Sequence, residues 1–269
     1  MIDTEEHTYY KCLSFENTNA SYSQGSIIEA TSGDIDAQGW FGCNFKAAPA
    51  DTSAVIMIAA TNSYHTCVFE ATTKNFDKIL SVTNNARVHN CRIIGGGTSS
   101  GSGNGDGAAL TSHTSQFVDC VITNCHGKGI HITSTNAKVN INFANCTIVN
   151  NGGDGIDTDI GQPLNSNIVG FGDANIIFGN GGAGLRANAA DDRQSGFQLL
   201  AMGDNSGGNF VDMDSYEDMI DVITVTTADF VDYANLDYRI KRTSTLYKIF
   251  GTRNIGAIQN EDFEFVSVS

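Results

Sequence analysis

The chain has 269 residues and a formal charge of −15, from 30 acidic and 15 basic residues, so its surface repels polyanions and argues against nucleic-acid binding. No apolar run approaches the roughly 18 residues that a membrane span requires, so we expect no membrane span. The 29 Gly and only 2 Pro favour strands and turns over helices.

Residues 1–24 show no sequence period, and we expect them to form an N-terminal extension or cap. Acidic residues stand where a secretory signal would carry Lys or Arg, and no apolar segment follows them. If Met1 is the natural start, we therefore expect no signal peptide. The seven cysteines, an odd number, are then expected to remain reduced.

Residues 25–260 are predicted to form one repeated domain, because similar residues return every 24 to 29 positions, and residues 261–269 to form a tail. The clearest repeated position is a cysteine column, with Asn175 next in line. Apolar residues keep register two positions after it and three positions before it. The cysteine column consists of Cys43, Cys67, Cys91, Cys120 and Cys146. Like side chains stacked inside a coil explain these five cysteines as packing residues.

A second set of short strands is predicted between these columns, since most of them follow Gly and alternate apolar with polar residues. These strands span residues 55–58, 79–82, 108–110, 130–132, 156–158 and 185–187. A coil whose turns hydrogen-bond at about 4.8 Å satisfies this pattern, with Gly and Asn at corners of positive φ.

Two insertions interrupt the repeat. Residues 95–107 form a Gly-rich segment that we expect to be a flexible loop bulging from the coil, and residues 160–171 contain Pro163. Insertions on one side of a solenoid often mark its working face. Residues 197–228 cannot be assigned to turns, and residues 229–259 are predicted to form a final turn and lid.

The repeat reading F-x-N-C-x-I-x-N-N-G-G-D-G-I at residues 143–156 resembles those of the right-handed parallel β-helix families, which include pectin-degrading enzymes and phage tailspikes. The ending D-F-V-D-Y-A-N-L-D-Y-R-I, followed by N-I-G-A-I-Q, is similar to their closing segment, although Thr245 stands where that segment has Pro. The resemblance implies an all-β, single-stranded, right-handed parallel β-helix of roughly eight turns with a C-terminal cap.

The same resemblance favours a bacteriophage virion surface protein that decorates the capsid or forms part of a tail spike or fibre. It implies a homotrimer that is assembled in the host cytoplasm, contacts other virion proteins and has a host surface glycan as a candidate ligand. The alternative is a polysaccharide lyase or hydrolase of the pectin-degrading type. A host-encoded glycan-binding adhesin would need an export signal.

One outward column of the second strand set contains a candidate ligand or interface site. Strand alternation points Ala109, His131, Asp157 and Arg186 outward on successive turns, with Asp159 beside them. This column is interpreted either as a sugar-binding or interface patch or as a solvated face whose charges pair along the stack, and the second interpretation is favoured.

A catalytic interpretation combines Asp157 and Asp159 with Asp191, Asp192 and the segment 239–241, in the order of the pectin-hydrolase motifs. The Gly-His segment of that family is missing, and residues 239–241 are already explained by the closing segment. No catalytic residue is therefore assigned.

No cofactor is predicted, although a single structural Ca²⁺ held by Asp154 or Asp157 is left open because residues 152–160 begin like a calcium-binding β-roll repeat. Two further arrangements are interpreted as packing. The first is a metal site that combines His65 and His89 with the cysteines two positions later, and the second is a Cys125–His126 nucleophile pair.

Overall fold

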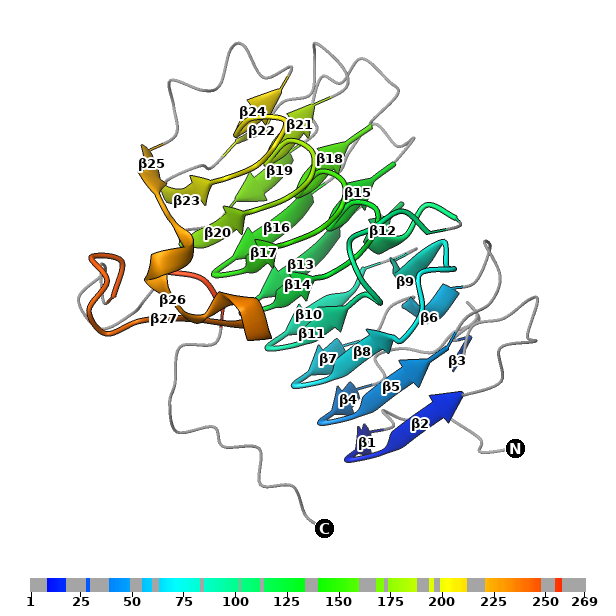
Figure 1. Cartoon of the computed structure of the whole chain (residues 1–269). Coiled ribbons are helices and arrows are strands. Elements are labelled where there is room, and N and C mark those ends of the chain that lie inside the picture. The colour runs from blue at the N-terminus through cyan, green and yellow to red at the C-terminus, as the bar shows by residue number, and fades with distance from the viewer. Residues whose placement is uncertain are drawn as a thin grey trace, which may run out of the picture.

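The computed structural model describes residues 9–17, 28–29, 39–48, 55–59, 63–82, 85–101, 103–111, 114–133, 140–159, 168–171, 174–187, 194–195, 199–211, 221–247 and 255–257. These residues form a parallel β-solenoid (Figure 1) in which three consecutive strands build one turn and each strand pairs with its equivalent in the next turn. Its only helices within those ranges are the short 3-10 turns η2 (Thr227–Asp229) and η3 (Tyr233–Asn235). The described part has no helix that could span a membrane.

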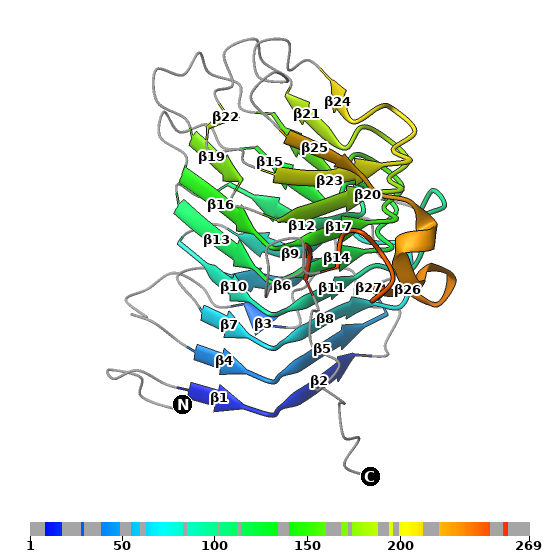
Figure 2. The same cartoon turned by 90° about the vertical axis from the view of Figure 1, so that its left-hand side faces the viewer.

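The solenoid has three parallel sheets that run side by side along its axis (Figure 2). The first contains, among described residues, β1 (Tyr9–Lys11), β4 (Gly39–Phe41), β7 (Ser63–His65), β10 (Arg87–His89), β13 (Thr114–Val118), β16 (Asn140–Ala144), β19 (Ile168–Phe171) and β22 (Gln194–Ser195). The second contains β2 (Ser14–Asn17), β5 (Asn44–Ala47), β8 (Val68–Ala71), β11 (Arg92–Ile94), β14 (Val121–Thr123), β17 (Thr147–Val149), β20 (Asn175–Phe178), β23 (Leu199–Gly203) and β25 (Asp221–Thr224). The third contains β3 (Ile28–Glu29), β6 (Val55–Ala59), β9 (Lys78–Val82), β12 (Asp106–Leu110), β15 (Ile130–Ile132), β18 (Ile156–Thr158), β21 (Leu185–Ala187) and β24 (Phe210–Val211).

The predicted columns are confirmed as stacks inside the coil. Every member of the cysteine column is at most 1% exposed, and all seven cysteines of the chain are free thiols. Within the cysteine column, each thiol from Cys67 onward donates to a main-chain carbonyl of the preceding turn, as Cys120 Sγ does to Val88 O at 3.2 Å. Asn175 takes over this role, because its Nδ2 donates to Phe143 O at 3.1 Å and its Oδ1 accepts from the Cys146 amide. A buried thiol and a buried amide can therefore occupy the same column when each finds a backbone partner.

The corners between the first and second sheets have the predicted positive φ, but Gly or Asn occupies only three of the five that precede the cysteine column. The residue before each member of the cysteine column has positive φ, and it is Gly42, Thr66, Asn90, Asp119 and Asn145 in order. Gly and Asn tolerate this left-handed conformation better than most residues, so their recurrence sets the sharp bend.

A second interior stack, the asparagine ladder, was not predicted. Asn151, Asn180 and Asn205 lie on successive turns. Asn180 Oδ1 accepts from the main-chain amide and from Nδ2 of Asn151, and Asn205 Oδ1 accepts from the same two groups of Asn180. Cys125 continues this stack on the preceding turn, where its amide donates to Asn151 Oδ1 at 3.2 Å. The ladder satisfies the backbone groups at the corner between the second and third sheets, where water does not reach.

The expected boundary of the N-terminal extension at residue 24 is wrong, because the coil has already begun at Tyr9. Strands β1 and β2 pair in parallel with β4 and β5, with Tyr10 in register with Trp40 and Phe15 with Phe45. The apolar residues of this first turn match those of the next turn in the sequence. The residues between the two turns, however, carry no repeat signal.

The Gly-rich insertion is held at both ends, which differs from the flexible bulge that we expected. Gly95 and Gly97 donate to Thr123 O and Asn124 O on the next turn, and Gly105 donates to Phe76 O on the preceding one. A Cβ on Gly96 would lie 2.3 Å from Thr73 O, so the backbone approaches too closely for any side chain. Its middle, residues 98–101 and 103–104, is mostly exposed. Within the second insertion, residues 160–167 lie outside the described ranges.

The closing segment, residues 226–247 and 255–257, lies against the outer face of the second sheet (Figures 1 and 2). The prediction of a lid over the end of the coil is therefore wrong. Its strands β26 (Phe230–Asp232) and β27 (Asp237–Ile240) form an antiparallel hairpin. Phe230 packs on Phe178 of β20, and Tyr238 bonds to Thr123 of β14 at 2.9 Å. The covered strands are buried on both faces, which is typical of a sheet that is packed on both sides.

The Asp237–Arg239 pair in this hairpin predicts a pH dependence. The Arg239 hydrogen bonds to Asp237, at 2.5 and 2.8 Å, lower the pKa of that carboxyl group below its ordinary value. A lowered folded-state pKa stabilises the fold above about pH 4 and loses this effect as the pH falls through the folded-state pKa. We expect Asp237→Asn to lower the free energy of unfolding by less than about 1 kcal/mol at pH 7. Thermal melts should show the two proteins converging near pH 2, and a constant difference would contradict the assignment.

Candidate functional site

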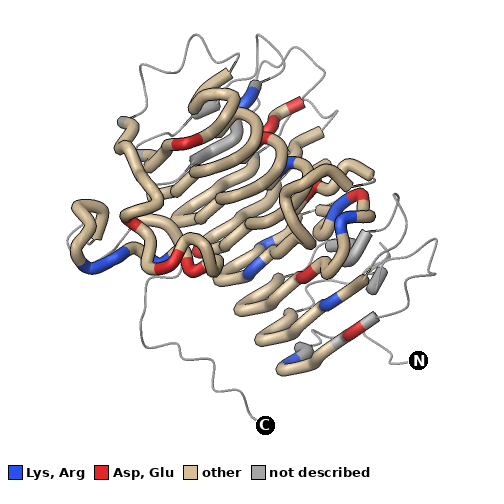
Figure 3. Tube along the Cα trace, viewed as in Figure 1, with Lys and Arg blue, Asp and Glu red and all other residues tan. Residues whose placement is uncertain are grey.

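Two columns of charged side chains run along the coil near the start of the third-sheet strands. One column occupies the residue just before a Gly, namely Asp106, Lys128 and Asp154 on successive turns. The other occupies the middle of the strand, where His131, Asp157 and Arg186 pair in register. We call these six residues the charge ladder. Figure 3 marks the acidic and basic residues along the described chain, and on the preceding turn Lys78 is in register with Asp106.

Glycines between the two columns bring the turns together. Gly129 and Gly155 stand between the two positions on their turns, and the Ile130 amide donates to Gly155 O at 2.9 Å. A Cβ on Gly129 would lie 2.7 Å from the same carbonyl oxygen and 2.7 Å from Ile148 Cγ2. Only Gly permits this approach, and it places both charged positions within reach of the next turn.

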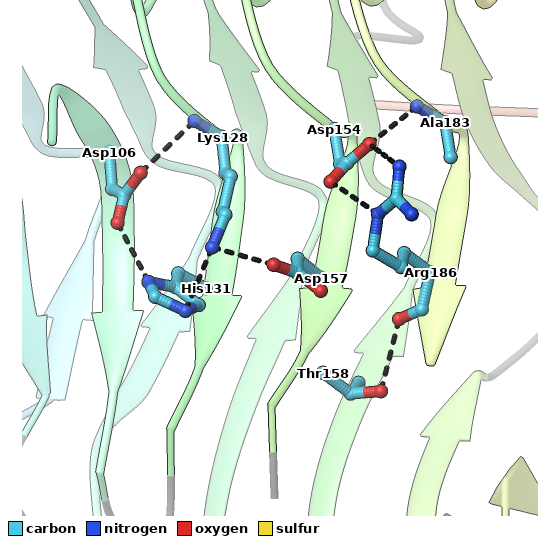
Figure 4. Close-up of polar contacts among 8 residues, drawn as sticks. All are labelled: Asp106, Lys128, His131, Asp154, Asp157, Thr158, Ala183 and Arg186. Atoms are coloured by element: carbon cyan, nitrogen blue, oxygen red, sulfur yellow. Dashed lines mark hydrogen bonds and ion pairs between the residues drawn. The ribbon is translucent and has the colours of Figure 1, made fainter. Parts of the chain in front are cut away.

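The two columns are joined by diagonal contacts, each from the first column to the second column one turn further on (Figure 4). Asp106 Oδ2 lies 2.9 Å from His131 Nδ1, and Lys128 Nζ lies 2.6 Å from Asp157 Oδ2. On the following step Arg186 donates from Nε to Asp154 Oδ2 at 2.9 Å and from Nη2 to Oδ1 at 3.2 Å. Every step therefore pairs an acid with a base, and the last pair is bidentate.

His131 lies between two charged partners, and these partners determine which of its ring nitrogens carries a hydrogen atom. Lys128 Nζ is 2.9 Å from His131 Nε2, and an ammonium group can only donate. Nε2 is therefore the acceptor, and Nδ1 carries the proton that is donated to Asp106. The geometry assigns a neutral imidazole within a continuous chain from Asp106 through His131 and Lys128 to Asp157.

The acids of the ladder are buried and the bases lie over them. Asp106 and Asp157 are 3% and 2% exposed, whereas the side chains of Lys128 and Arg186 are 28% and 29% exposed. Backbone amides add to the binding of the carboxylates, since Asp106 Oδ1 accepts from the Lys128 amide at 3.0 Å and Asp154 Oδ1 from the Ala183 amide at 2.5 Å. The ladder thus presents mostly basic groups to solvent in an otherwise acidic protein.

The predicted column of His131, Asp157 and Arg186 exists, but its members differ in exposure. Asp157 lies on the same face as His131 and Arg186 but is buried beneath Lys128, and Asp159 is exposed and makes no described contact in the ladder. Sequence reasoning did not place Asp106, Lys128 and Asp154 beside this column, and it named Asp154 only as a candidate Ca²⁺ ligand. The signal was available, because all three stand immediately before a Gly at or next to the start of a third-sheet strand.

The structure does not bring the pectin-hydrolase motif residues together in the described part of the chain. Arg239 lies in the hairpin over the second sheet and is paired with Asp237, while Asp157 lies on the third sheet. Asp191 and Asp192 lie outside the described residues.

The structure also shows what surrounds the two candidate metal sites, the Ca²⁺ site and the His–Cys site. Both oxygen atoms of Asp154 bind Arg186, and Asp157 binds Lys128, so basic side chains occupy the positions that a Ca²⁺ ion would need. Among the described residues there is no group of three or more His, Cys, Asp or Glu side chains that could hold a metal ion. The thiols of Cys67 and Cys91 lie in the core, while His65 and His89 stack edge to face outside it, and burial lowers the pKa of His65.

Cys125 and His126 do not form a nucleophile pair. Cys125 is fully buried, its thiol donates to Thr123 O at 3.5 Å, and burial raises its pKa. The His126 ring packs on Phe76 and bonds to Gly103 O at 3.3 Å. A thiol with a raised pKa that water cannot reach is unreactive, so Cys125 is a packing residue.

The comparisons with known proteins found no match: no family model, no curated protein and no solved structure matches this chain. The fold and the geometry of the charge ladder therefore carry the functional argument.

Proposed function

We propose that the chain is a structural surface protein of a bacteriophage virion, either a capsid decoration protein or a component of a tail spike or fibre. In this proposal the solenoid is a right-handed coil of roughly eight turns, forms a homotrimer in the host cytoplasm and binds other virion proteins. The proposal is supported by the parallel solenoid and by the resemblance of residues 143–156 and of the closing segment to virion β-helices.

The observation that carries the non-enzymatic part of the proposal is the pairing within the charge ladder. Acid–base catalysis requires a carboxyl group or imidazole that reaches the substrate and exchanges a proton with it. Each carboxylate of the ladder instead binds a basic side chain of the same chain and is at most 11% exposed. Such an arrangement ties successive turns together, which is a structural role.

A polysaccharide lyase or hydrolase is the second candidate, and one feature favours it. Asp106 orients His131 through Nδ1, as a carboxylate orients a general base in many enzymes. The remaining nitrogen, however, accepts a hydrogen bond from Lys128, so a substrate would first have to displace that ammonium group.

The exposed basic groups suggest how the proposed virion protein would contact a ligand. Lys128, His131 and Arg186 are half-buried in a row, with the Asp159 carboxylate exposed beside them. This row suits hydroxyl and carboxylate groups of a host surface glycan or an acidic patch on a neighbouring virion protein.

Immunogold electron microscopy would test the proposed location. Antibodies against the purified chain are applied to phage particles released from bacteria that carry the coding sequence. Gold on capsids would support a decoration protein, and gold on tails would support a spike or fibre. Purified particles that bind no more gold than particles lacking the gene would overturn the proposal.

The proposed trimer is tested by light scattering on the full chain, with Asp157→Ala and Arg186→Ala measured beside it. We expect a mass of three chains for all three proteins if the exposed row is free for a ligand. Loss of the trimer in both variants would place the ladder in the subunit interface, and a monomeric parent chain would contradict a self-assembled spike.

A further inference from the structure

The cysteine column belongs to a longer stack that runs the full length of the second sheet. We call it the axial column. Strand register extends it by one residue at the N-terminal end and by two beyond Asn175. Its members are Leu13, Cys43, Cys67, Cys91, Cys120, Cys146, Asn175, Leu200 and Val222. The core of the solenoid is therefore continuous from the first described turn to the last strand of the second sheet.

Only the two ends of the axial column are exposed. The seven residues from Cys43 to Leu200 are at most 1% exposed, whereas Leu13 is 39% and Val222 is 38% exposed. One other large apolar side chain in the described chain is comparably exposed, Val231 at 43%, and it lies in the hairpin on the side of the coil. Two apolar residues that belong to the core by register thus face solvent at opposite ends of the molecule.

The two edge strands of the second sheet also carry main-chain amide and carbonyl groups at the positions that form hydrogen bonds inside the sheet. Along the coil, the residue after each column member donates its amide to the column member one turn below, as Asn44 does to Leu13 O at 2.8 Å and Val68 to Cys43 O at 2.9 Å. Strands β2 and β25 are the two edges of this sheet. An edge strand beside an apolar patch pairs readily with another strand of matching register.

We propose that copies of this chain stack head to tail, with β25 of one copy pairing in parallel with β2 of the next. Val222 then covers Leu13 of the adjoining copy, and the Ser14 amide donates to the Val222 carbonyl, which extends the axial column across the junction. The partner is a second copy because the contact only repeats the one between successive turns of the same chain. This contact uses the ends of the coil and so is independent of the proposed virion location and of a lateral trimer.

A head-to-tail contact does not close on itself, so it generates a linear array of units. Nine strands of the second sheet, spaced about 4.8 Å apart, predict an axial repeat of about 43 Å. Since each copy carries a formal charge of −15, repulsion opposes the contact and added salt should strengthen it.

Sedimentation velocity of the full chain, at rising protein and salt concentration, would test the inference with two end variants. Leu13→Asp and Val222→Asp each place a carboxylate in the junction and are expected to weaken association about 100-fold or more. Both residues are exposed in the single chain, so the variants should fold, as circular dichroism would verify. Val231→Asp is the matched control, because it changes an equally exposed residue away from both ends and should associate like the parent chain.

Mixing the two end variants distinguishes head-to-tail stacking from other contacts. Each variant alone lacks one half of the junction and stays as single units, whereas an equimolar mixture retains one intact junction and should form pairs of units that grow no further. A variant that pairs by itself would indicate a symmetric contact and overturn the head-to-tail arrangement. A parent chain that remains as single units at high protein and salt concentration would overturn the inference entirely.

Discussion

Replacing Asn180 by Ala is expected to lower the free energy of unfolding by about 4 kcal/mol. The side chain is fully buried, and its Nδ2 donates to Asn205 Oδ1 at 2.9 Å and to Ile148 O at 3.3 Å. Its Oδ1 accepts from both the amide and the side chain of Asn151. Alanine removes all four contacts and leaves buried polar groups on two neighbouring turns without this partner. Urea denaturation followed by circular dichroism measures the change.

The control for this substitution is Asn235→Ala. Asn235 is exposed, and its side chain donates only to Asp232 at 2.6 Å in the described structure. We expect its loss to change stability by less than about 1 kcal/mol. If Asn180→Ala were no more destabilising than Asn235→Ala, the asparagine ladder would not contribute to the stability of the coil.

The substitution Lys128→Met is expected to destabilise the fold by about 3 kcal/mol. Methionine preserves the length and much of the packing of the side chain, but it removes the ammonium group that binds Asp157 at 2.6 Å and His131 at 2.9 Å. The Asp157 carboxylate is 3% exposed and cannot recover this interaction from water. The same denaturation experiment at neutral pH measures the loss.

One control substitution and one double-mutant cycle make the Lys128→Met prediction specific to the charge ladder. Lys46→Met removes a base from an exposed pair, Lys46–Glu70 at 3.5 Å, and should cost no more than about 0.5 kcal/mol. In a double-mutant cycle, Asp157→Asn should reduce the cost of Lys128→Met, giving a coupling of about 2 kcal/mol. Additive losses from the two substitutions would mean that the contact does not stabilise the folded chain.

The interior of the solenoid was predictable because stacked residues must be alike. A cysteine followed two positions later by Phe or Ile, as in Cys67 and Phe69, recurs on five turns. This recurrence indicates both the period and the register. The six strands predicted between these columns are all present in the third sheet, as β6, β9, β12, β15, β18 and β21. The repeat signal is weak at residues 9–17, so the sequence did not reveal this turn, although its strands pair in register with the next turn.

Half of the charge ladder could be predicted, for a physical reason. Alternation within a strand identifies His131, Asp157 and Arg186 as one column, but it does not reveal residues that precede the strand. Lys128 and Asp154 reach the column only because the glycines that follow them bring the turns close together. The burial of Asp157 follows from that diagonal contact, so alternation alone placed it wrongly in solvent.

The position of the closing segment depends on contacts distant in sequence. Tyr238 bonds to Thr123, and Ala257 donates to the Thr147 side chain at 2.8 Å. The apolar outer residues of β14 and β17, such as Val121 and Val149, indicate that something covers this face. Nothing in a local pattern says which segment covers it, and the resemblance to a capping motif favoured the end of the coil instead of its side.

We propose that the charge ladder holds successive turns together and does not catalyse the cleavage of a glycan. The most direct test of this claim is the release of new chain ends from acidic and neutral polysaccharides by the purified parent chain and by Asp157→Asn. We expect neither protein to release chain ends above the level of the buffer, while Asp157→Asn is less stable than the parent. Release by the parent chain that Asp157→Asn abolishes, in a variant shown to be folded, would contradict the claim and favour the lyase or hydrolase.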